Sequence, residues 1–429
     1  MTDGLLPRHL KRELHDALTS ARVVNIIGPR QAGKTTLVRD LFGKGRFISF
    51  DNEGVLAALE SDPLGQLQHL VKAAGDAPVI IDEAQRSKKL ALALKMVVDE
   101  TRRPGQFLLT GSSNIFATAH VTDSLAGRVR TLTMLPLSGA EVHRMGPVLL
   151  LDWARRGADA AQLPSPPPCS RDDYIDLIIR GGYPEIRVLN QRARSNRYRD
   201  YVDAIVDRDV ADLLKIRKTD AMRRLIEQLA VRTANELNVQ DLCNAVSLKR
   251  DTVEQYLDIL TRLCLVTRLG SWTSGEVRRE VRHPKIHTID ARLTSALRNF
   301  TPMIFAADAN PTALGGLLES FVYTELLKSL PYQQDHWRLY HWRGEHGKEV
   351  DVIAEADRTL VCFEMKAAVT VESGDFKHLR SFKSTDGPGR SWTVIGVVIY
   401  LGKEVLTFGD GLFALPLSMF WAFPEQAPA

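Results

Sequence analysis

The sequence predicts a three-part chain: an α/β domain with a parallel sheet, a mostly helical middle section and an α+β C-terminal domain. Three observations support this. Residues 1–145 alternate short β-rich runs with helical patterns, as a parallel sheet requires. Residues 173–270 follow a mainly helical pattern, and a helix at 317–328 precedes four strand-like runs. A chain of 429 residues also exceeds one compact core.

The N-terminal domain is expected to hold four strands, at residues 23–27, 47–50, 78–81 and 107–110. These runs are almost continuously apolar, which suits strands that helices cover on both faces of the sheet. A helix is expected at residues 36–42, directly after the first strand.

A proline-rich linker is expected at residues 146–172, because its core, LPSPPPCSR at 163–171, is too rich in proline for regular structure. The middle section covers 173–270, the C-terminal domain 285–405 and a tail 406–429. Strands of the C-terminal domain are expected at 337–342, 350–355, 360–366 and 392–400.

In the middle section, residues 239–245, 248–263 and 265–269 read as helix, helix and strand, which predicts a winged helix-turn-helix. The second helix mixes basic and acidic side chains, so packing between domains is favoured over DNA reading. Two basic groups are better candidates for nucleic acid, although a solvated surface is the simpler interpretation: Arg192, Arg194, Arg197 and Arg199, and Arg278, Arg279, Arg282 and His283.

The composition is that of an ordinary globular protein, with 44% apolar residues, 25% charged residues and a net charge of +4. Its four cysteines form no close pair, which argues against zinc knuckles and a disulfide framework. The start of the chain lacks a secretion signal, and the longest apolar stretches are too short to span a bilayer. We therefore expect a cytoplasmic protein without a membrane partner.

A glycine-rich loop, GPRQAGKT, lies between the first strand and the helix that follows it. This spacing is typical of a loop whose backbone N–H groups surround phosphates at a helix N-terminus. Lys34 would reach the β- and γ-phosphates, and the Thr35 hydroxyl would bind magnesium. The alternative is a strand-to-helix turn without nucleotide. The candidate residues for binding ATP are Gly28, Pro29, Arg30, Gln31, Ala32, Gly33, Lys34, Thr35 and Thr36.

Two carboxylates, Asp82 and Glu83, follow the apolar run at 79–81. Asp82 would hold Mg²⁺ through water, and Glu83 would orient or deprotonate the attacking water; a helix cap is the ordinary alternative. Ser112, at the tip of the next strand, would contact the γ-phosphate or the water, unless it caps the following helix. Arg128 would act as an arginine finger on a neighbouring subunit or form a surface ion pair.

A second group of charged residues lies in the C-terminal domain. If residues 350–355 and 360–366 form a hairpin around a four-residue turn at 356–359, paired residues have numbers that sum to 715. Asp351 then faces Glu364, and Glu349 faces Lys366. Opposed carboxylates call for a cation, so we expect a second divalent metal on Asp351, Glu364 and Glu319, with Glu325 as a competitor. Lys366 would activate a water. The alternative is a Glu349–Lys366 ion pair with solvated neighbours.

The motifs GPRQAGKTTL, VIIDEAQ, LLTGSS and SLAGR, followed by LPLSGAE and GGYPE, resemble the AAA+ ATPases and, within them, the archaeal-type group of ATP-binding proteins. The segments LLESFVYTEL, WRGEHGKEVDVI and CFEMKAA resemble the PD-(D/E)xK nucleases, which implies a restriction-endonuclease-like fold. The resemblance implies an ATPase that acts on nucleic acid, with DNA as the expected partner, and that assembles as a homo-oligomer. A regulatory switch whose nuclease-like domain only binds nucleic acid or a protein is the alternative.

Overall fold

The computed structural model describes residues 5–42, 45–113, 115–116, 127–210, 219–274, 284–305 and 311–425. The chain forms two compact units. The N-terminal unit comprises Arg8–Pro136 and Arg262–Cys264; the C-terminal unit comprises Met1–Pro7, Leu137–Thr261 and Leu265–Ala429. Within the described ranges, no helix is both long enough and apolar enough to cross a membrane.

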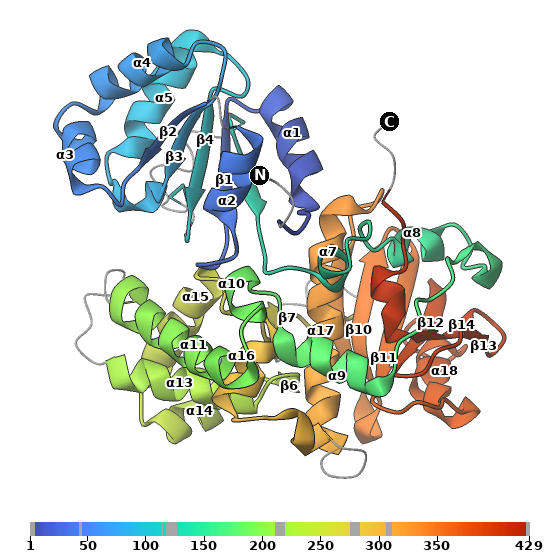
Figure 1. The fold of residues 1–429 in the computed structure, drawn as a ribbon. Coiled ribbons are helices and arrows are strands. Elements are labelled where there is room, and N and C mark those ends of the chain that lie inside the picture. Colours follow the sequence, from blue (N-terminus) through green and yellow to red (C-terminus); the bar gives the residue numbers. More distant parts are fainter. Residues whose placement is uncertain are drawn as a thin grey trace. The chain divides into compact units, whose positions relative to one another are not determined.

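The N-terminal unit contains a five-stranded parallel sheet in the order β2-β3-β4-β1-β5. Strands β1 to β4 are labelled in Figure 1. The predicted parallel sheet is thus confirmed, with β5 as an additional edge strand. Its elements are α1 (Leu10–Ser20), β1 (Val23–Ile27), α2 (Lys34–Leu41), β2 (Arg46–Ser49), α3 (Glu53–Ser61), α4 (Pro63–Ala74), β3 (Val79–Asp82), η1 (Ala84–Arg86), α5 (Leu90–Thr101), β4 (Phe107–Gly111) and β5 (Val129–Thr133).

Two apolar cores cover the two faces of this sheet, because successive strand residues point to opposite sides. Leu108 of β4 packs with α1 and α2, whereas Phe107 and Leu109 pack with α4 and α5. Local signals set the helix starts: the Asn52 side chain caps α3, and Asp62 caps α4 just before Pro63.

The C-terminal unit contains a three-stranded and a six-stranded sheet. Its first elements are α7 (Gly139–Val142), α8 (Leu150–Arg155), η2 (Ala160–Gln162), α9 (Arg171–Arg180), α10 (Pro184–Arg187), α11 (Gln191–Ala204), η3 (Ile205–Val210), α13 (Thr219–Val231), β6 (Asn235–Glu236), α14 (Val239–Val246), α15 (Arg250–Arg262), β7 (Val266–Leu269), β8 (Lys285–Thr288) and α16 (Ala291–Leu297). The antiparallel sheet of this part has the order β6-β8-β7.

The six-stranded sheet has the order β13-β14-β12-β11-β10-β9. Its part of the chain comprises η5 (Pro302–Phe305), α17 (Pro311–Ser329), η6 (Leu330–Tyr332), β9 (Arg338–Arg343), η7 (Glu345–Gly347), β10 (Glu349–Ala356), β11 (Thr359–Lys366), η8 (Ser373–Phe376), α18 (Lys377–Lys383), β12 (Thr393–Tyr400), β13 (Leu406–Thr407), β14 (Leu412–Pro416) and η9 (Leu417–Trp421). Strands β9, β10 and β11 pair antiparallel, and β12 joins β11 in parallel after α18.

The hairpin of β10 and β11 has the expected register. Pairs run from Val352–Phe363 to Ala356–Thr359, so the numbers of each pair sum to 715, as predicted. The turn is tighter than expected, because Ala356 and Thr359 pair directly and leave two residues between them. On its other side, β10 shifts register against β9 between Val350 and Ile353. This β-bulge covers Asp351 and Val352 and interrupts the regular alternation of faces there.

Three expected segment boundaries differ from the structure. The expected linker contains α8, whose Trp153 is buried in the large core of the C-terminal unit. The expected tail contains β13, β14 and η9, and Trp421 lies in the same core. The apolar side chains of both segments explain this, because burying them outweighs the effect of nearby prolines. The middle and C-terminal sections form one unit.

Candidate functional site

The phosphate loop has the backbone shape that its glycines permit. It joins β1 to α2, and positive φ angles occur at Gly28 (149°), Gln31 (59°) and Gly33 (99°). A Cβ atom at Gly28 would lie 2.1 Å from the Met134 carbonyl oxygen, so any side chain there would collide with backbone. The predicted nucleotide residues from Gly28 to Thr36 therefore form one loop and the first turn of α2.

Lys34 folds back over this loop. Its ammonium donates to the carbonyl oxygens of Gly28 and Pro29, both at 2.8 Å. The side chain is buried, and burial lowers the pKa of Lys34 to about 8, although the Glu83 carboxylate opposes the shift. Bound phosphates would supply a stronger counter-charge than these two carbonyl groups.

Asp82 joins the loop to the centre of the sheet. One of its carboxylate oxygens accepts a hydrogen bond from the Thr35 hydroxyl at 3.0 Å and another from the Thr110 hydroxyl. The three residues meet because β1, β4 and β3 are neighbours in a parallel sheet, whose C-terminal strand ends lie at one edge. Oxygen donors of this kind suit Mg²⁺, so Thr35 and Asp82 fit the metal that accompanies a nucleotide.

Thr110 was missed in the sequence, where Ser112 was the preferred hydroxyl of the same strand end. The available signal was a polar residue closing an otherwise apolar strand. Choosing between the two hydroxyls requires knowing that β4 lies between β1 and β3, which local sequence does not state.

Glu83 belongs to a second chain of hydrogen bonds. It has a left-handed backbone conformation (φ 56°), and its carboxylate accepts from the Gln85 amide at 2.7 Å. The same amide nitrogen lies 3.2 Å from the Ser112 hydroxyl oxygen. Gln85 therefore links Glu83 to Ser112, a positioning role that the sequence did not suggest. Arg30 also approaches Glu83, with its guanidinium 4.0 Å from a carboxylate oxygen.

Arg128 lies at the end of the sheet where the strands begin, opposite the end that carries the phosphate loop. It directly precedes β5, whose first residue pairs with the first residue of β1, so it is at the strand N-termini. Its guanidinium forms a 2.5 Å ion pair with Asp99 of α5. The phosphate loop lies about five residues further along the strands, roughly 16 Å away. Arg128 thus does not serve the nucleotide of its own chain in this arrangement.

Two of the predicted C-terminal residues, Glu319 and Asp351, meet at a buried lysine that was not predicted. Lys285, the first residue of β8, lies 2.7 Å from a Glu319 oxygen of α17 and 3.5 Å from an Asp351 oxygen of β10. The second Asp351 oxygen accepts from the Met365 backbone N–H at 3.0 Å. No motif marks Lys285, because only the folded chain brings β8 beside α17 and β10.

Glu364 and Lys366 have other partners. A Glu364 oxygen lies 3.7 Å from the His378 ring nitrogen Nδ1, and the Lys366 ammonium lies 3.2 Å from Asp375. The alternative interpretation expected an ion pair between Glu349 and Lys366. Lys366 pairs with Asp375 instead. Across the described residues, no three His, Cys, Asp or Glu side chains are grouped so that they could hold a metal. The second divalent metal is therefore not supported.

Burial and like charge shape the protonation of this group. Burial raises the pKa of Glu319 to about 8; Asp351 adds to the rise and Lys285 opposes it. Burial alone would lower the pKa of Lys285, but Glu319 and Asp351 outweigh it and hold that pKa above its ordinary value. Burial, followed by Asp351 and Glu349, raises the pKa of Glu364. The two carboxylates therefore favour the charged form of Lys285.

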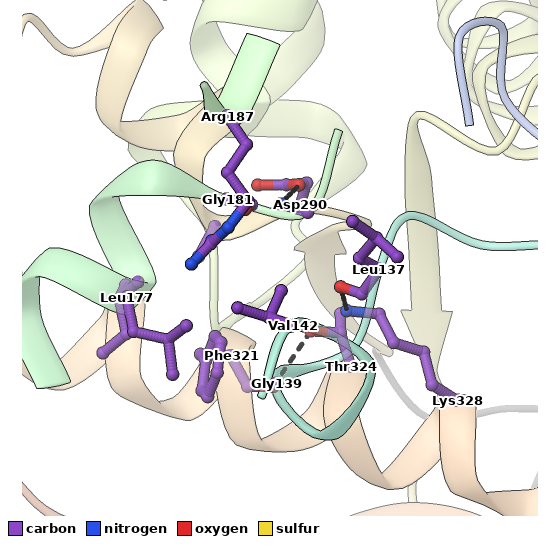
Figure 2. Close-up of a pocket in the computed structure, with 13 residues that line it drawn as sticks. Leu137, Gly139, Val142, Leu177, Gly181, Arg187, Asp290, Phe321, Thr324 and Lys328 are labelled. Carbon is purple, nitrogen blue, oxygen red and sulfur yellow. Dashed lines mark hydrogen bonds between the residues drawn. The ribbon is translucent and has the colours of Figure 1, made fainter. Parts of the chain in front are cut away.

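Glu325, the alternative to Glu319 as a metal ligand, makes structural contacts instead. One carboxylate oxygen accepts from the Gly139 N–H at 2.8 Å, and the other contacts Lys328 at 2.8 Å. Lys328 also donates to the Leu137 carbonyl oxygen at 3.2 Å (Figure 2). The cavity beside these residues is small: about 10 Å³ is open to the centre of a water molecule, which is close to the minimum for one water. We therefore assign Glu325 and Lys328 to packing and not to a substrate site.

The basic residues proposed for nucleic acid separate in the structure. On α11, Arg192, Arg197 and Arg199 are exposed, whereas Arg194 is buried. On α15, Arg250 pairs with Glu254 of the same helix at 2.8 Å. The group of Arg278, Arg279, Arg282 and His283 lies outside the described residues.

Family models match three parts of the chain. An AAA domain matches residues 20–143, a domain of unknown function (DUF8612) matches 171–303, and another (DUF4143) matches 314–420. Among solved structures, the chain is similar to a Walker-type ATPase of Pyrococcus abyssi (TM-score 0.44, 14% identity, 69% of this chain and 97% of that one). It is also similar to a signal transduction ATPase with numerous domains from Pyrococcus horikoshii (TM-score 0.28, 11% identity, 76% and 47%).

Two related proteins match most of the chain. These are the uncharacterized proteins Rv2008c of Mycobacterium tuberculosis and Mb2031c of Mycobacterium bovis, each 30% identical over 365 residues, or 85% of this chain and 74% of the relative. The uncharacterized protein MJ1544 of Methanocaldococcus jannaschii is 22% identical over 373 residues, or 83% of this chain and 78% of the relative. The chain belongs to the family of these mycobacterial proteins, and with an AAA domain that carries the loop at Lys34 and the carboxylates at Asp82 and Glu83, it is an ATPase.

Proposed function

We propose that ATP hydrolysis in the N-terminal unit drives or licenses an action of the C-terminal unit on nucleic acid, with DNA as the first substrate to test. The observation that carries the ATP site is the convergence of Thr35 and Thr110 on one Asp82 oxygen beside the buried Lys34. Phosphoryl transfer depends mainly on positioning and charge, and these residues supply both.

Each residue has a defined part in this proposal. The Lys34 ammonium leaves the Gly28 and Pro29 carbonyl groups and binds the β- and γ-phosphates. Thr35 and Asp82 would hold Mg²⁺, which would neutralise phosphate charge. Glu83 orients the attacking water and accepts its proton, while Gln85 and Ser112 fix the Glu83 carboxylate. Thr110 keeps Asp82 in place.

The element order of the C-terminal unit supports the nucleic-acid part. The run α13-β6-α14-α15-β7-β8, with the sheet order β6-β8-β7, is the arrangement expected of a winged helix. The run α17-β9-β10-β11-α18-β12 around a mixed sheet is the arrangement expected of a PD-(D/E)xK nuclease-like domain. Exposed arginines on α11 offer phosphate contacts.

A second function is favoured by one specific observation. Because Lys285 occupies the space between Glu319 and Asp351, the nuclease-like domain would bind nucleic acid or a protein without cutting. In this version the chain is an ATP-dependent regulatory switch.

Separate variants test the two sites. Glu83→Gln should bind ATP but lose turnover by about 100-fold or more, the usual range for a general base, whereas Glu53→Gln, an exposed residue of α3, should hydrolyse normally. DNA cleavage by wild type that Asp351→Ala abolishes supports the nuclease. DNA binding with no cleavage by any preparation supports the switch, and the absence of both binding and cleavage on all nucleic acids contradicts the coupling.

We also propose that the protein works as a homo-oligomer in which Arg128 reaches the ATP of a neighbour. Arg128→Ala and Glu83→Gln proteins should each be inactive alone and regain ATPase activity when mixed, since mixed interfaces combine an intact arginine with an intact Glu83. Arg22→Ala is the matched control, because Arg22 shares Asp99 with Arg128 without the proposed role. Full activity of Arg128→Ala would contradict the finger.

A further inference from the structure

Lys285 links two parts of the C-terminal unit. It belongs to β8, the central strand of the three-stranded sheet, where it pairs with Glu236 of β6 and Leu269 of β7. Its side chain leaves that sheet and ends between Glu319 of α17 and Asp351 of β10. Only 4% of Lys285 is exposed, so its ammonium is committed to these carboxylates and not to solvent.

The two carboxylates are held from several sides. Asp351 lies in the β10 bulge, and its second oxygen accepts from the Met365 N–H. Glu319 of α17 keeps only 12% of its side chain exposed, and the ammonium approaches it to 2.7 Å. A bulge that redirects a carboxylate into a buried group with a lysine is a built feature of the fold.

An ammonium and a divalent cation compete for these oxygens, and two cations a few ångströms apart in a buried site repel strongly. A divalent metal also needs several oxygen ligands around one point, and with the ammonium in place the described side chains have no such grouping. The residues in this arrangement therefore fit a bound lysine and do not fit a metal.

We propose that Lys285 is an internal cation that closes the C-terminal carboxylate site to divalent metals, so that the site becomes available only when the lysine side chain leaves it. The proposal rests on the proposed nuclease-like function of this domain. We call this arrangement the lock: a residue of the three-stranded sheet, in β8, blocks a carboxylate site that includes Asp351 of the six-stranded sheet.

Metal binding without nucleotide tests the lock directly, since the ATP-site metal is then not retained by phosphates. Mn²⁺ is titrated into the full chain and free Mn²⁺ is followed by electron paramagnetic resonance. Wild type should bind no Mn²⁺ with micromolar affinity, Lys285→Met should bind one, and Lys285→Met with Asp351→Asn should bind none. Lys403→Met, at an exposed lysine of the same unit, is the matched control; it should behave as wild type.

Two results would overturn the lock. One is a micromolar Mn²⁺ site in wild type that Asp351→Asn removes, because metal and lysine would then coexist. The other is a folded Lys285→Met protein, with an unchanged circular dichroism spectrum, that binds no Mn²⁺. If Lys285→Met binds Mn²⁺ but neither it nor wild type cuts DNA, the lock stands and the nuclease proposal fails.

Chemical labelling tests the lock without changing Lys285, in case Lys285→Met does not fold. Wild type is treated briefly with an acetylating reagent, and each lysine is quantified by mass spectrometry. Lys285 should react at least 10-fold less than the exposed Lys72, and Asp351→Asn with Glu319→Gln should raise its labelling severalfold. Equal labelling of Lys285 and Lys72 in wild type would contradict the proposal.

Discussion

At Lys34, burial and charge act in opposite directions on one ammonium group. Burial lowers its pKa to about 8, while Glu83 favours the charged form. The carbonyl oxygens of Gly28 and Pro29 hold the group over the loop. Phosphate binding requires the charged form, so nucleotide affinity is linked to the protonation of this residue.

Nucleotide affinity should therefore fall as the pH rises through about 8. The free protein loses the Lys34 proton above that pH, and ADP must restore it on binding, so affinity at pH 9 should be about tenfold weaker than at pH 7. Fluorescent ADP titrated at each pH measures this. Lys34→Arg keeps its charge at every pH used and should show a flat profile at its own affinity; a flat wild-type profile would contradict the pKa.

Gly28 is the loop position least able to accept a side chain. Gly28→Ala should abolish ADP binding and lower stability by about 1–3 kcal/mol, since its φ of 149° suits glycine and the added Cβ would meet the Met134 carbonyl group. Urea denaturation and ADP titration measure both effects. Gly315→Ala is the control, because nothing lies within 4 Å of the added carbon, and unchanged ADP affinity in Gly28→Ala would refute the expectation.

Among single residues, the sequence predicted those that a local motif marks. Gly28, Lys34 and Thr35 are adjacent in the chain, and Asp82 with Glu83 follow an apolar run. Thr110, Gln85 and Lys285 could not be selected in the same way. Their roles depend on strand order and on packing between sheets, which are properties of the folded chain.

Helix α17 carries charged groups with two different purposes. Glu319 faces Lys285, whereas Glu325 receives the Gly139 N–H and Lys328. A helix can do this because residues six positions apart point in different directions. The spacing of the two glutamates alone did not reveal which belonged to the charged group of the hairpin.

Removing the Glu325 carboxylate should strongly destabilise the C-terminal unit. Glu325→Ala leaves the buried Gly139 N–H without its acceptor and leaves Lys328 with the Leu137 carbonyl oxygen but without its carboxylate. Loss of a buried charged partner usually costs about 3–5 kcal/mol. Urea denaturation followed by tryptophan fluorescence measures the change. Glu227→Ala, on the exposed side of α13, should stay within about 0.5 kcal/mol of wild type. An equally small effect at Glu325 would show that water replaces its contacts.

The register of the β10–β11 hairpin could be predicted because side chains alternate with a period of two. The short turn and the bulge at Asp351 could not, since each depends on one residue more or fewer in a strand. Asp351 therefore contacts Lys285 and the Met365 N–H in place of a simple opposition to Glu364.

On the scale of the whole molecule, the chain forms two compact units, and the expected middle and C-terminal sections share one of them. The proline-rich segment suggested a linker, but Trp153 and Trp421 bring the segments at both ends of the C-terminal unit into one core. Composition marks where proline occurs and does not reveal where a neighbouring tryptophan is buried.

The two units should unfold in separate steps, and ADP should act on one of them. Calorimetry should show two transitions, with the N-terminal transition raised by ADP, because a ligand at 100 times its Kd adds about 2.7 kcal/mol to the unit that binds it. Lys34→Ala should remove the shift without moving the other transition. A single transition that moves as a whole would mean that the units unfold together.

The bulge in β10 has a genetic consequence. An extra residue in one strand cannot be undone by exchanging side chains, so libraries of point substitutions will not sample its reversal. Removing one codon at position 351 or 352 would restore regular pairing with β9. The side chains of β10 on one side of the deletion would then point to the opposite face of the sheet. Reversing the bulge therefore takes an insertion or a deletion, whereas a substitution at Lys285 or Asp351 changes a charged partner and leaves the strand register in place.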